Sequence, residues 1–201
     1  MIIQHLLLAF FWICYCFIHS FFASTVFKLF VEKRSGKLYR YYRLSYSIFA
    51  LITLIFLLWY QFSFLSPQLY HSTVINYLSM ILVIPGILIM IISIYKYFRL
   101  LSGIRSLYVP QPSPQLRIDG IHQYLRHPLY LGTLLFTWGI FFIFPLLNNF
   151  IAVAVLSIYI FIGIKLEEKK LVQEFGESYK AYQVQVPMII PHRHKSGNKK
   201  R

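Results

Sequence analysis

Long uninterrupted apolar runs are the feature that most constrains how this chain can fold. Of its 201 residues, 58% are hydrophobic and 13% are charged, whereas a water-soluble domain usually carries about 25% charged residues. Several runs are long enough to cross a hydrocarbon core of about 30 Å, which takes about 20 helical residues. The sequence therefore predicts an all-α fold, a polytopic transmembrane helical bundle.

Five apolar stretches are predicted as spans, at residues 2–27, 44–65, 74–95, 131–147 and 150–165. Only Asn148 and Asn149 separate the last two, so these helices should form an antiparallel hairpin. Apolar residues at helical spacing continue beyond the fifth stretch and predict an amphipathic cytoplasmic helix that ends before Pro187.

We expect three regions along the chain. Residues 1–98 hold the first three spans, residues 99–191 form a region with its own chemistry around the helical hairpin, and residues 192–201 are a basic disordered tail. Pro110, Pro112 and Pro114 exclude helix between spans three and four and predict an extended crossing there.

The basic residues are distributed unevenly and predict the orientation. Twenty Lys and Arg stand against six Asp and Glu, a formal net charge of +14. Six of the cations lie between residues 28 and 43, five between 96 and 126, and nine from 165 onward, whereas the other two connections have none. The positive-inside rule therefore places the N-terminus outside and the C-terminus in the cytoplasm. This orientation fits the inner membrane of a bacterium or the endoplasmic reticulum of a eukaryote. No nucleic-acid partner is expected, because no soluble basic module is present.

Cys14 and Cys16 lie inside the first apolar run, where their side chains point in different directions and cannot bridge each other. We interpret them as small apolar residues. The first run also lacks a basic region before it and is too long for a signal peptide, so cleavage is not expected.

The stretch Gly120-Ile-His-Gln-Tyr-Leu-Arg-His-Pro-Leu-Tyr-Leu-Gly132 gathers polar chemistry at the entrance of a span. One interpretation is structural: Arg126 and the tyrosines anchor the interface, Pro128 starts a helix and Gly132 permits close helix packing. The other is a functional site, and Glu167 and Glu168 across the hairpin favour it, because acidic residues at a membrane interface are costly without a role.

Together these residues resemble the integral-membrane methyltransferases, which include isoprenylcysteine carboxyl methyltransferase and the phospholipid N-methyltransferases. The shared pattern is R-H-P-x-Y-x-G, a hydrophobic hairpin, then E-E and F-G-x-x-Y-x-x-Y-x-x-x-V-P, over roughly residues 116–191. The resemblance implies an S-adenosylmethionine cofactor, bound between the two cytoplasmic segments rather than on a Rossmann sheet.

The resemblance also implies which residues form the site. His127 and Arg126 are the candidate catalytic residues. The candidate cofactor-binding residues are Leu116, His122, His127, Pro128, Leu129, Tyr130, Glu167 and Glu168. Carboxylates and phenol rings suit the sulfonium and ammonium of S-adenosylmethionine, and His and Arg donors suit its carboxylate and ribose. Glu167 is assigned to the ammonium or ribose, and Arg126 to structure or to the carboxylate.

Methyl transfer from a sulfonium requires no protonation of the leaving group, so placement in a water-poor pocket can supply much of the catalysis. A base is needed only where the acceptor must lose a proton, and His127 is the candidate assistant. No metal is expected, since His122 and His127 are five residues apart and no third ligand is near.

Two departures from the family pattern limit the choice of acceptor. His122 stands where the family commonly has an aromatic residue. Gly163 stands where the eukaryotic prenylcysteine enzymes have an acceptor-contacting Arg, which makes a prenylated carboxylate a poorer candidate.

The first two spans resemble bacterial relatives that include the methanethiol S-methyltransferases, on short matches around His19-Ser20 and Tyr41 to Tyr46. His19 and Ser20 are therefore candidate acceptor residues, with a buried histidine bonded to a neighbouring helix as the structural alternative.

The leading hypothesis is a membrane methyltransferase acting on a small or lipophilic acceptor, a thiol, carboxylate or lipid amine that enters from the lipid bilayer. The second is a non-enzymatic accessory membrane protein of the same fold, which binds a redox or assembly partner. A transporter is disfavoured, because the spans contain almost no charge and no internal repeat is visible.

Overall fold

A computed structural model describes residues 1–101, 116 and 118–190, with side chains outside 96–101. The regular structure of this part of the chain is helical, apart from one isolated β-bridge between Gln68 and Leu146. The helices are α1 (Ile2–Ala23), α2 (Thr25–Ser35), α3 (Tyr39–Phe62), α4 (Thr73–Leu101), α5 (Pro128–Ile143), α6 (Leu147–Phe175) and α7 (Glu177–Gln185), with 3-10 turns η1 (Gly36–Leu38) and η3 (Gly120–Gln123). The predicted all-α bundle is confirmed.

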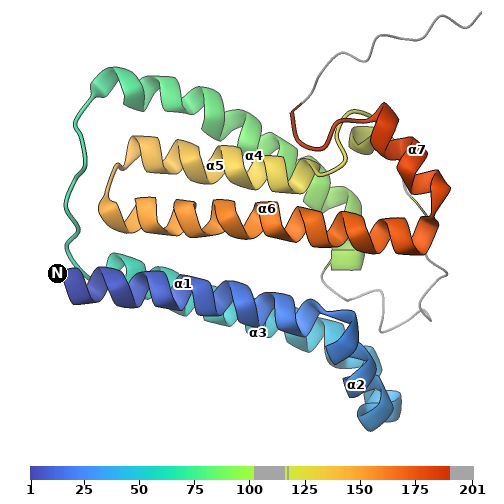
Figure 1. The fold of residues 1–201 in the computed structure, drawn as a ribbon. Coiled ribbons are helices and arrows are strands. Elements are labelled where there is room, and N and C mark those ends of the chain that lie inside the picture. The colour runs from blue at the N-terminus through green and yellow to red at the C-terminus, as the bar shows by residue number, and fades with distance from the viewer. Residues whose placement is uncertain (102–115, 117, 191–201) are drawn as a thin grey trace, which may run out of the picture.

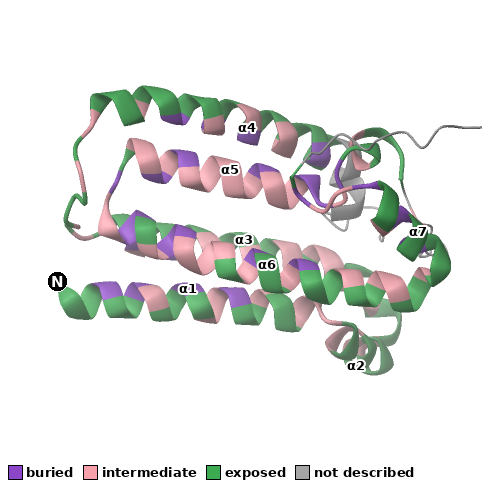
Figure 2. Ribbon diagram, turned by 45° about the horizontal axis from the view of Figure 1, so that its top comes forward, coloured by how far each residue is buried: buried purple, intermediate pink, exposed green. Residues whose placement is uncertain are grey.

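Four segments are long and apolar enough to cross a membrane: Ile2–Ala23, Thr25–Phe62, Thr73–Tyr95 and Leu147–Phe175. Helix α5 has 16 residues and is the shorter fifth apolar helix. Figure 1 shows α4, α5 and α6 side by side, with α1 and α3 along the other side of α6. The buried residues lie on the inner faces of the helices, and the outer faces of α1, α3 and α4 are exposed (Figure 2). Because large apolar side chains such as Phe17, Phe56 and Ile91 lie on the exposed surface, lipid is its expected solvent.

The first predicted span, residues 2–27, ends earlier than expected. Helix α1 stops at Ala23, because Ser24 adopts an extended conformation and its Oγ accepts a 3.2 Å hydrogen bond from Phe27 N as the N-cap of α2. A second short helix therefore precedes α3, which itself begins at Tyr39, before the predicted Leu44.

The hairpin turn was predicted at Asn148 and Asn149, and this was wrong. The turn is Phe144 to Leu146, and both asparagines belong to the first turn of α6, where they are buried. The predicted cytoplasmic helix also differs: α6 runs on to Phe175, and Gly176, at φ 56°, separates it from α7. The left-handed conformation suits glycine, which lacks a Cβ. The expectations for residues 110–114 and 192–201 lie outside the described residues.

Glycines allow α4 and α5 to pack closely. A Cβ on Gly86 would lie 2.7 Å from Phe136 N and 3.0 Å from Gly132 O, and one on Gly132 would lie 2.9 Å from Met90 Cγ. The close backbone contact matches the predicted role of Gly132, and small residues are typical of such helix interfaces in membranes.

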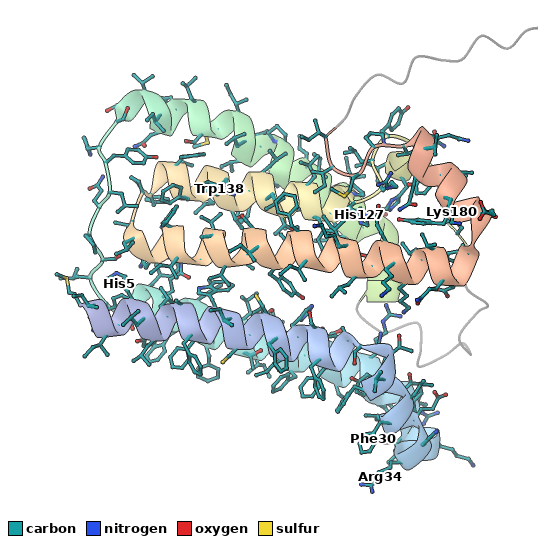
Figure 3. The ribbon with its side chains drawn as sticks, viewed as in Figure 1. His5, Phe30, Arg34, His127, Trp138 and Lys180 are labelled. Carbon is teal, nitrogen blue, oxygen red and sulfur yellow. The ribbon has the colours of Figure 1, made fainter. Side chains whose placement is uncertain are left out.

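A buried polar network joins α1, α3 and α6. Trp12 Nε1 donates to Gln61 Oε1 at 2.9 Å, Gln61 Nε2 donates to Asn149 Oδ1 at 2.9 Å, and Asn148 Nδ2 donates to Gln61 O at 2.8 Å. His5 Nε2 and Ser66 Oγ, 3.0 Å apart, extend it. In Figure 3, His5 lies at the opposite end of the bundle from His127. Since the alternative partner here is lipid, the network fixes the register of the three helices.

Replacing Gln61 by leucine should lower the stability of the bundle. The change leaves the indole N–H of Trp12 and the amide oxygen of Asn149 unpaired, at a cost of about 1–3 kcal/mol for each such buried group. Thermal unfolding of the detergent-purified protein measures the loss, with the exposed Gln4→Leu as control. An unchanged unfolding midpoint for Gln61→Leu would show that the network contributes no stability.

Candidate functional site

The predicted site residues between α4 and α5 are held in a short stretch directly before α5. Gly120, at φ 62°, opens the turn η3, and His127 is the N-cap residue of α5 with Pro128 in its first turn. Proline suits that position because its missing N–H has no helical partner there. The predicted helix start at Pro128 is confirmed.

This stretch is paired with the chain that follows α7. Arg126 N donates to Pro187 O at 3.0 Å, and His127 N donates to Met188 O at 3.1 Å. The side chain of Arg126 reaches the same region, where Nη1 donates to Gln183 O at 2.8 Å and to Val186 O at 2.6 Å. The segment before α5 and the segment after α6 are therefore joined by backbone and guanidinium contacts.

Glu168 is the hub of the site. It lies on α6, whose 29 residues extend for about 43 Å at 1.5 Å per residue, beyond the reach of a hydrocarbon core of about 30 Å. Arg126 Nε donates to Glu168 Oε1 at 2.7 Å, and His127 Nε2 lies 3.2 Å from the same oxygen. Tyr179 OH lies 3.4 Å from Oε1, and Gln183 Nε2 donates to Oε2 at 3.1 Å. Four side chains from two segments, the stretch before α5 and helix α7, thus surround one carboxylate on α6.

Burial and the charges around Glu168 shift the pKa values of Glu168 and Tyr179. Burial raises the pKa of Glu168, but the hydrogen bonds and charges of Arg126 and then His127 outweigh burial, so its pKa lies below the ordinary glutamate value. Burial, and then the Glu168 charge, raise the pKa of Tyr179 above its ordinary value. Glu168 is therefore an anion at neutral pH, and Tyr179 remains a protonated donor.

Glu167 differs from its neighbour in exposure and contacts. Its side chain is 45% exposed, against 16% for Glu168, and its Oε2 lies 3.9 Å from His127 Nδ1. It also interacts with Tyr130 on the first turn of α5. The Glu168 carboxylate is occupied by protein donors, so Glu167 is the more accessible carboxylate of the pair.

The remaining predicted cofactor residues surround this hub. His122 Nδ1 lies 3.1 Å from Arg126 O, and Tyr182 OH donates to His122 O at 2.6 Å. Leu116 packs against the cluster of Tyr179, Tyr182 and Val186. Pro128 is fully buried and Leu129 is half-buried beside it.

Gln183 and Tyr179 were missing from the predicted site. Their spacing of four residues, which places two side chains on one helix face, could have indicated that both reach the same group. The backbone carbonyls of Gln183 and Val186 give no such indication in the sequence.

His19 and Ser20 lie apart from the hub but are linked to it through α6. Tyr46 OH lies 2.8 Å from His19 Nδ1, and Ser20 Oγ donates to Tyr159 OH at 3.0 Å. Tyr159 and Tyr130 pack against the same cluster of Ile160, Ile164 and Ile189. His19 also lines a small hollow between α1 and α3, walled mainly by aromatic and aliphatic side chains. Its contact with Tyr46 fits the structural alternative, a histidine bonded to a neighbouring helix.

Two further predictions concern cysteines and metals. Cys14 and Cys16 are both free thiols. Across residues 1–101, 116 and 118–190, no three His, Cys, Asp or Glu side chains converge as a metal site would require.

A family model described as "Phospholipid methyltransferase" matches residues 70–178, just over half of the chain. The match includes Arg126, His127 and Glu168 but ends before Tyr179 and Gln183. The chain belongs to this family. The resemblance inferred from the R-H-P-x-Y and E-E motifs is thereby confirmed, and no solved structure matches the chain.

Several curated relatives are named methyltransferases. The "Methanethiol S-methyltransferase" of Crocosphaera subtropica is 38% identical over 98 residues, 45% of this chain and 37% of that protein. The "Methanethiol S-methyltransferase 1" of Bradyrhizobium diazoefficiens is 37% identical over 82 residues, 40% of this chain and 27% of that protein. The "Protein-S-isoprenylcysteine O-methyltransferase" of Schizosaccharomyces pombe is 38% identical over 77 residues, 36% of this chain and 31% of that protein. The matched part of the chain thus spans about a third of the length of these relatives. Their names favour an enzyme over the accessory protein.

Proposed function

We propose that this chain is a membrane methyltransferase that takes its methyl group from S-adenosylmethionine. The proposal rests on the different surroundings of two adjacent carboxylates. Glu168 is enclosed by protein donors, whereas Glu167 is half exposed beside His127 and Tyr130. An accessible carboxylate can bind a cationic ligand through a charge-assisted hydrogen bond.

The residues of the site fit this cofactor chemically. The Glu167 carboxylate suits an ammonium or ribose hydroxyl, and the half-buried ring of Tyr130 suits a sulfonium, since cations are attracted to aromatic faces. Leu116, His122, Pro128 and Leu129 would complete the walls. When bound, the cofactor supplies an activated methyl group on sulfur.

Two of the protein's own side chains, Arg126 and His127, have separate roles in this proposal. Arg126 binds Glu168 and the backbone carbonyls of Gln183 and Val186, at the end of α7, which supports a positioning role for it rather than a catalytic one. His127 Nε2 faces Glu168, so the ring is fixed with Nδ1 toward Glu167. In this position Nδ1 could take a proton from the substrate that receives the methyl group.

A small thiol is the first acceptor to test, because relatives of this chain are named for methanethiol. The polar groups of His19, Ser20 and Tyr159, which lie on the α1 side of Tyr130, would form its approach from the bilayer. Carboxylates and lipid amines are the other acceptors. We place the N-terminus outside and the hub in the cytoplasm, on the charge distribution.

Replacing Glu167 by glutamine should weaken S-adenosylmethionine binding about 10- to 100-fold, the equivalent of a lost charged hydrogen bond of about 1.5–3 kcal/mol. His127→Ala should weaken it as well. Calorimetry on the detergent-purified protein, with S-adenosylhomocysteine as competitor, measures both affinities.

Glu174→Gln is the matched control for this experiment, because Glu174 is an exposed carboxylate on the same helix. It should bind like the parent. Equal affinities for the parent, Glu167→Gln and His127→Ala would refute the site. Well-folded parent protein that binds no S-adenosylmethionine would instead support the accessory role.

A further inference from the structure

Three tyrosines surround His19, a half-buried residue of the membrane-spanning helix α1. Tyr15 lies one turn earlier on α1, and its ring stacks with the imidazole at a distance of 6.0 Å between ring centres. The rings of Tyr46 on α3 and Tyr159 on α6 lie 5.3 Å and 6.5 Å from the same imidazole. Helix α1 packs against both α3 and α6 (Figure 1), so this cluster lies where three helices meet.

The hydrogen bonds of Tyr46 determine the tautomer of His19. Tyr46 OH lies 3.0 Å from His19 O and 2.8 Å from His19 Nδ1. A carbonyl oxygen can only accept, so it takes the single hydroxyl proton, and Nδ1 must then donate its own proton to the hydroxyl oxygen. Only the neutral tautomer with its proton on Nδ1 satisfies both contacts. Nε2, across the ring, therefore has a lone pair and is a hydrogen-bond acceptor.

Two polar atoms of this cluster are left for a ligand, His19 Nε2 and the hydroxyl of Tyr15. Among residues 1–101, 116 and 118–190, neither atom has a hydrogen-bond partner. Tyr159 differs, because its hydroxyl accepts a hydrogen bond from Ser20 Oγ at 3.0 Å. Unpaired polar groups are unfavourable where lipid replaces water, so a ligand that pairs with both atoms would be stabilised.

The same two side chains line the small hollow between α1 and α3, whose other walls are mainly aromatic and aliphatic. The hydroxyl of Thr53, which also lines it, donates within its own helix to Phe49 O at 2.8 Å. A small thiol matches this lining. Its S–H is a weak donor for Nε2, its sulfur can accept from a phenol, and sulfur packs favourably against aromatic rings. A carboxylate has no proton to donate to Nε2.

We propose that His19 Nε2 and the Tyr15 hydroxyl bind the methyl acceptor by its S–H group, and that Tyr46 is the positioning residue that keeps Nε2 unprotonated. The hollow would then select thiols over acceptors that have no proton to donate. Tyr159, beside His19, and Tyr130, at the hub, pack against the same isoleucine cluster, so one layer of side chains joins the two sites. This inference rests on the proposed methyltransferase function and names the residues that choose its acceptor.

The test is the initial rate of methanethiol methylation by the detergent-purified protein, with S-adenosylmethionine affinity measured by calorimetry on the same preparations. His19→Phe removes Nε2 but keeps an aromatic ring. It should raise the KM for methanethiol about tenfold, the effect of one lost hydrogen bond, and leave kcat and the cofactor affinity near the parent values. His19→Gln, whose amide reaches the position of Nε2, should recover part of the loss. Tyr46→Phe should raise KM about threefold, because the tautomer is no longer fixed.

Tyr60→Phe is the matched control for Tyr46→Phe. Tyr60 also lies on α3, and its hydroxyl also donates to a backbone carbonyl of α1, Gln4 O, at 3.4 Å, but at the other end of the two helices. This variant should keep the parent KM.

Four outcomes would overturn the inference. The first is an unchanged KM in His19→Phe and Tyr46→Phe, and the second is an equal rise in Tyr60→Phe, which would mean a general loosening of α1 from α3. The third is a parent that methylates a carboxylate or a lipid amine but no thiol, which would leave the methyltransferase function intact. The fourth is a parent that binds no S-adenosylmethionine, which would overturn both proposals. If His19→Phe does not fold, Tyr46→Phe, which keeps its ring, decides the test against Tyr60→Phe.

Discussion

Replacing Glu168 by glutamine should both destabilise the part of the protein around the hub and weaken ligand binding there. The amide would turn one of the two acceptor oxygens into a donor, opposite Arg126 Nε or Gln183 Nε2, and would leave the guanidinium without its counter-charge. Removing one partner of a largely buried pair costs about 3 kcal/mol or more. Hydrogen exchange of residues 183–188 should rise, and S-adenosylmethionine affinity should fall at least as far as in Glu167→Gln.

The pH dependence of stability distinguishes a contribution from the Glu168 charge from one that comes only from packing of its side chain. Because the pKa of Glu168 is lowered on folding, its contribution is fully present above the unfolded value of about 4.3 and is lost as the pH falls through the lower folded value. The parent should therefore lose stability below about pH 4, and Glu168→Gln should lose less over the same interval. Glu177→Gln, which removes an exposed pair with Lys180, is the control and should change little. Unaltered exchange at residues 183–188 in Glu168→Gln would contradict the hub.

Replacing Gly86 by valine should disrupt the packing of α4 on α5. The new Cβ would lie 2.7 Å from the backbone nitrogen of Phe136, which cannot move away without shifting α5. Overpacking of this kind costs about 1–3 kcal/mol, and occasionally more where backbone must shift. Because α5 carries His127 and Tyr130 at its start, the shift should also lower ligand affinity. Thermal unfolding and calorimetry on the same preparation measure the two effects.

Gly163 provides the matched control for that substitution. It lies inside a helix as Gly86 does, but a Cβ there would have no neighbour within 4 Å. Gly163→Val should therefore change the unfolding midpoint far less than Gly86→Val. Equal midpoints for the two variants would show that the glycine contact does not hold the two helices together.

The apolar runs and the R-H-P and E-E motifs were sufficient to predict the helical fold and most of the residues at the hub, because hydrophobic length and residue chemistry are visible in a single sequence. The helix boundaries were less predictable. Asn148 and Asn149 have the composition of a turn, yet they are buried in α6, since Gln61 and Phe144 supply their hydrogen-bond partners. A tertiary partner of this kind overrides local preference.

Two features of the structure could not be predicted from the sequence, the helix cap at Ser24 and the carbonyl contacts of Gln183 and Val186. Ser24 interrupts an apolar run by capping a new helix, a feature that hydropathy alone does not register. The carbonyls of Gln183 and Val186 bind Arg126 through backbone atoms, which carry no sequence identity. The sequence could therefore predict that the two segments flanking the helical hairpin meet, but not that a guanidinium joins them.

The backbone pairing of Arg126 and His127 with Pro187 and Met188 has a consequence for how the protein is made. All five apolar helices precede these partners in the sequence, so they leave the ribosome first, and the helices can enter the bilayer while the hub still lacks a wall. Arg126 can form its hydrogen bond to Val186 O only after a segment some sixty residues downstream has been synthesised. A chain truncated after α6 would retain all five apolar helices but lack these backbone partners, so the pairing of Arg126 and His127 requires that synthesis has passed Met188.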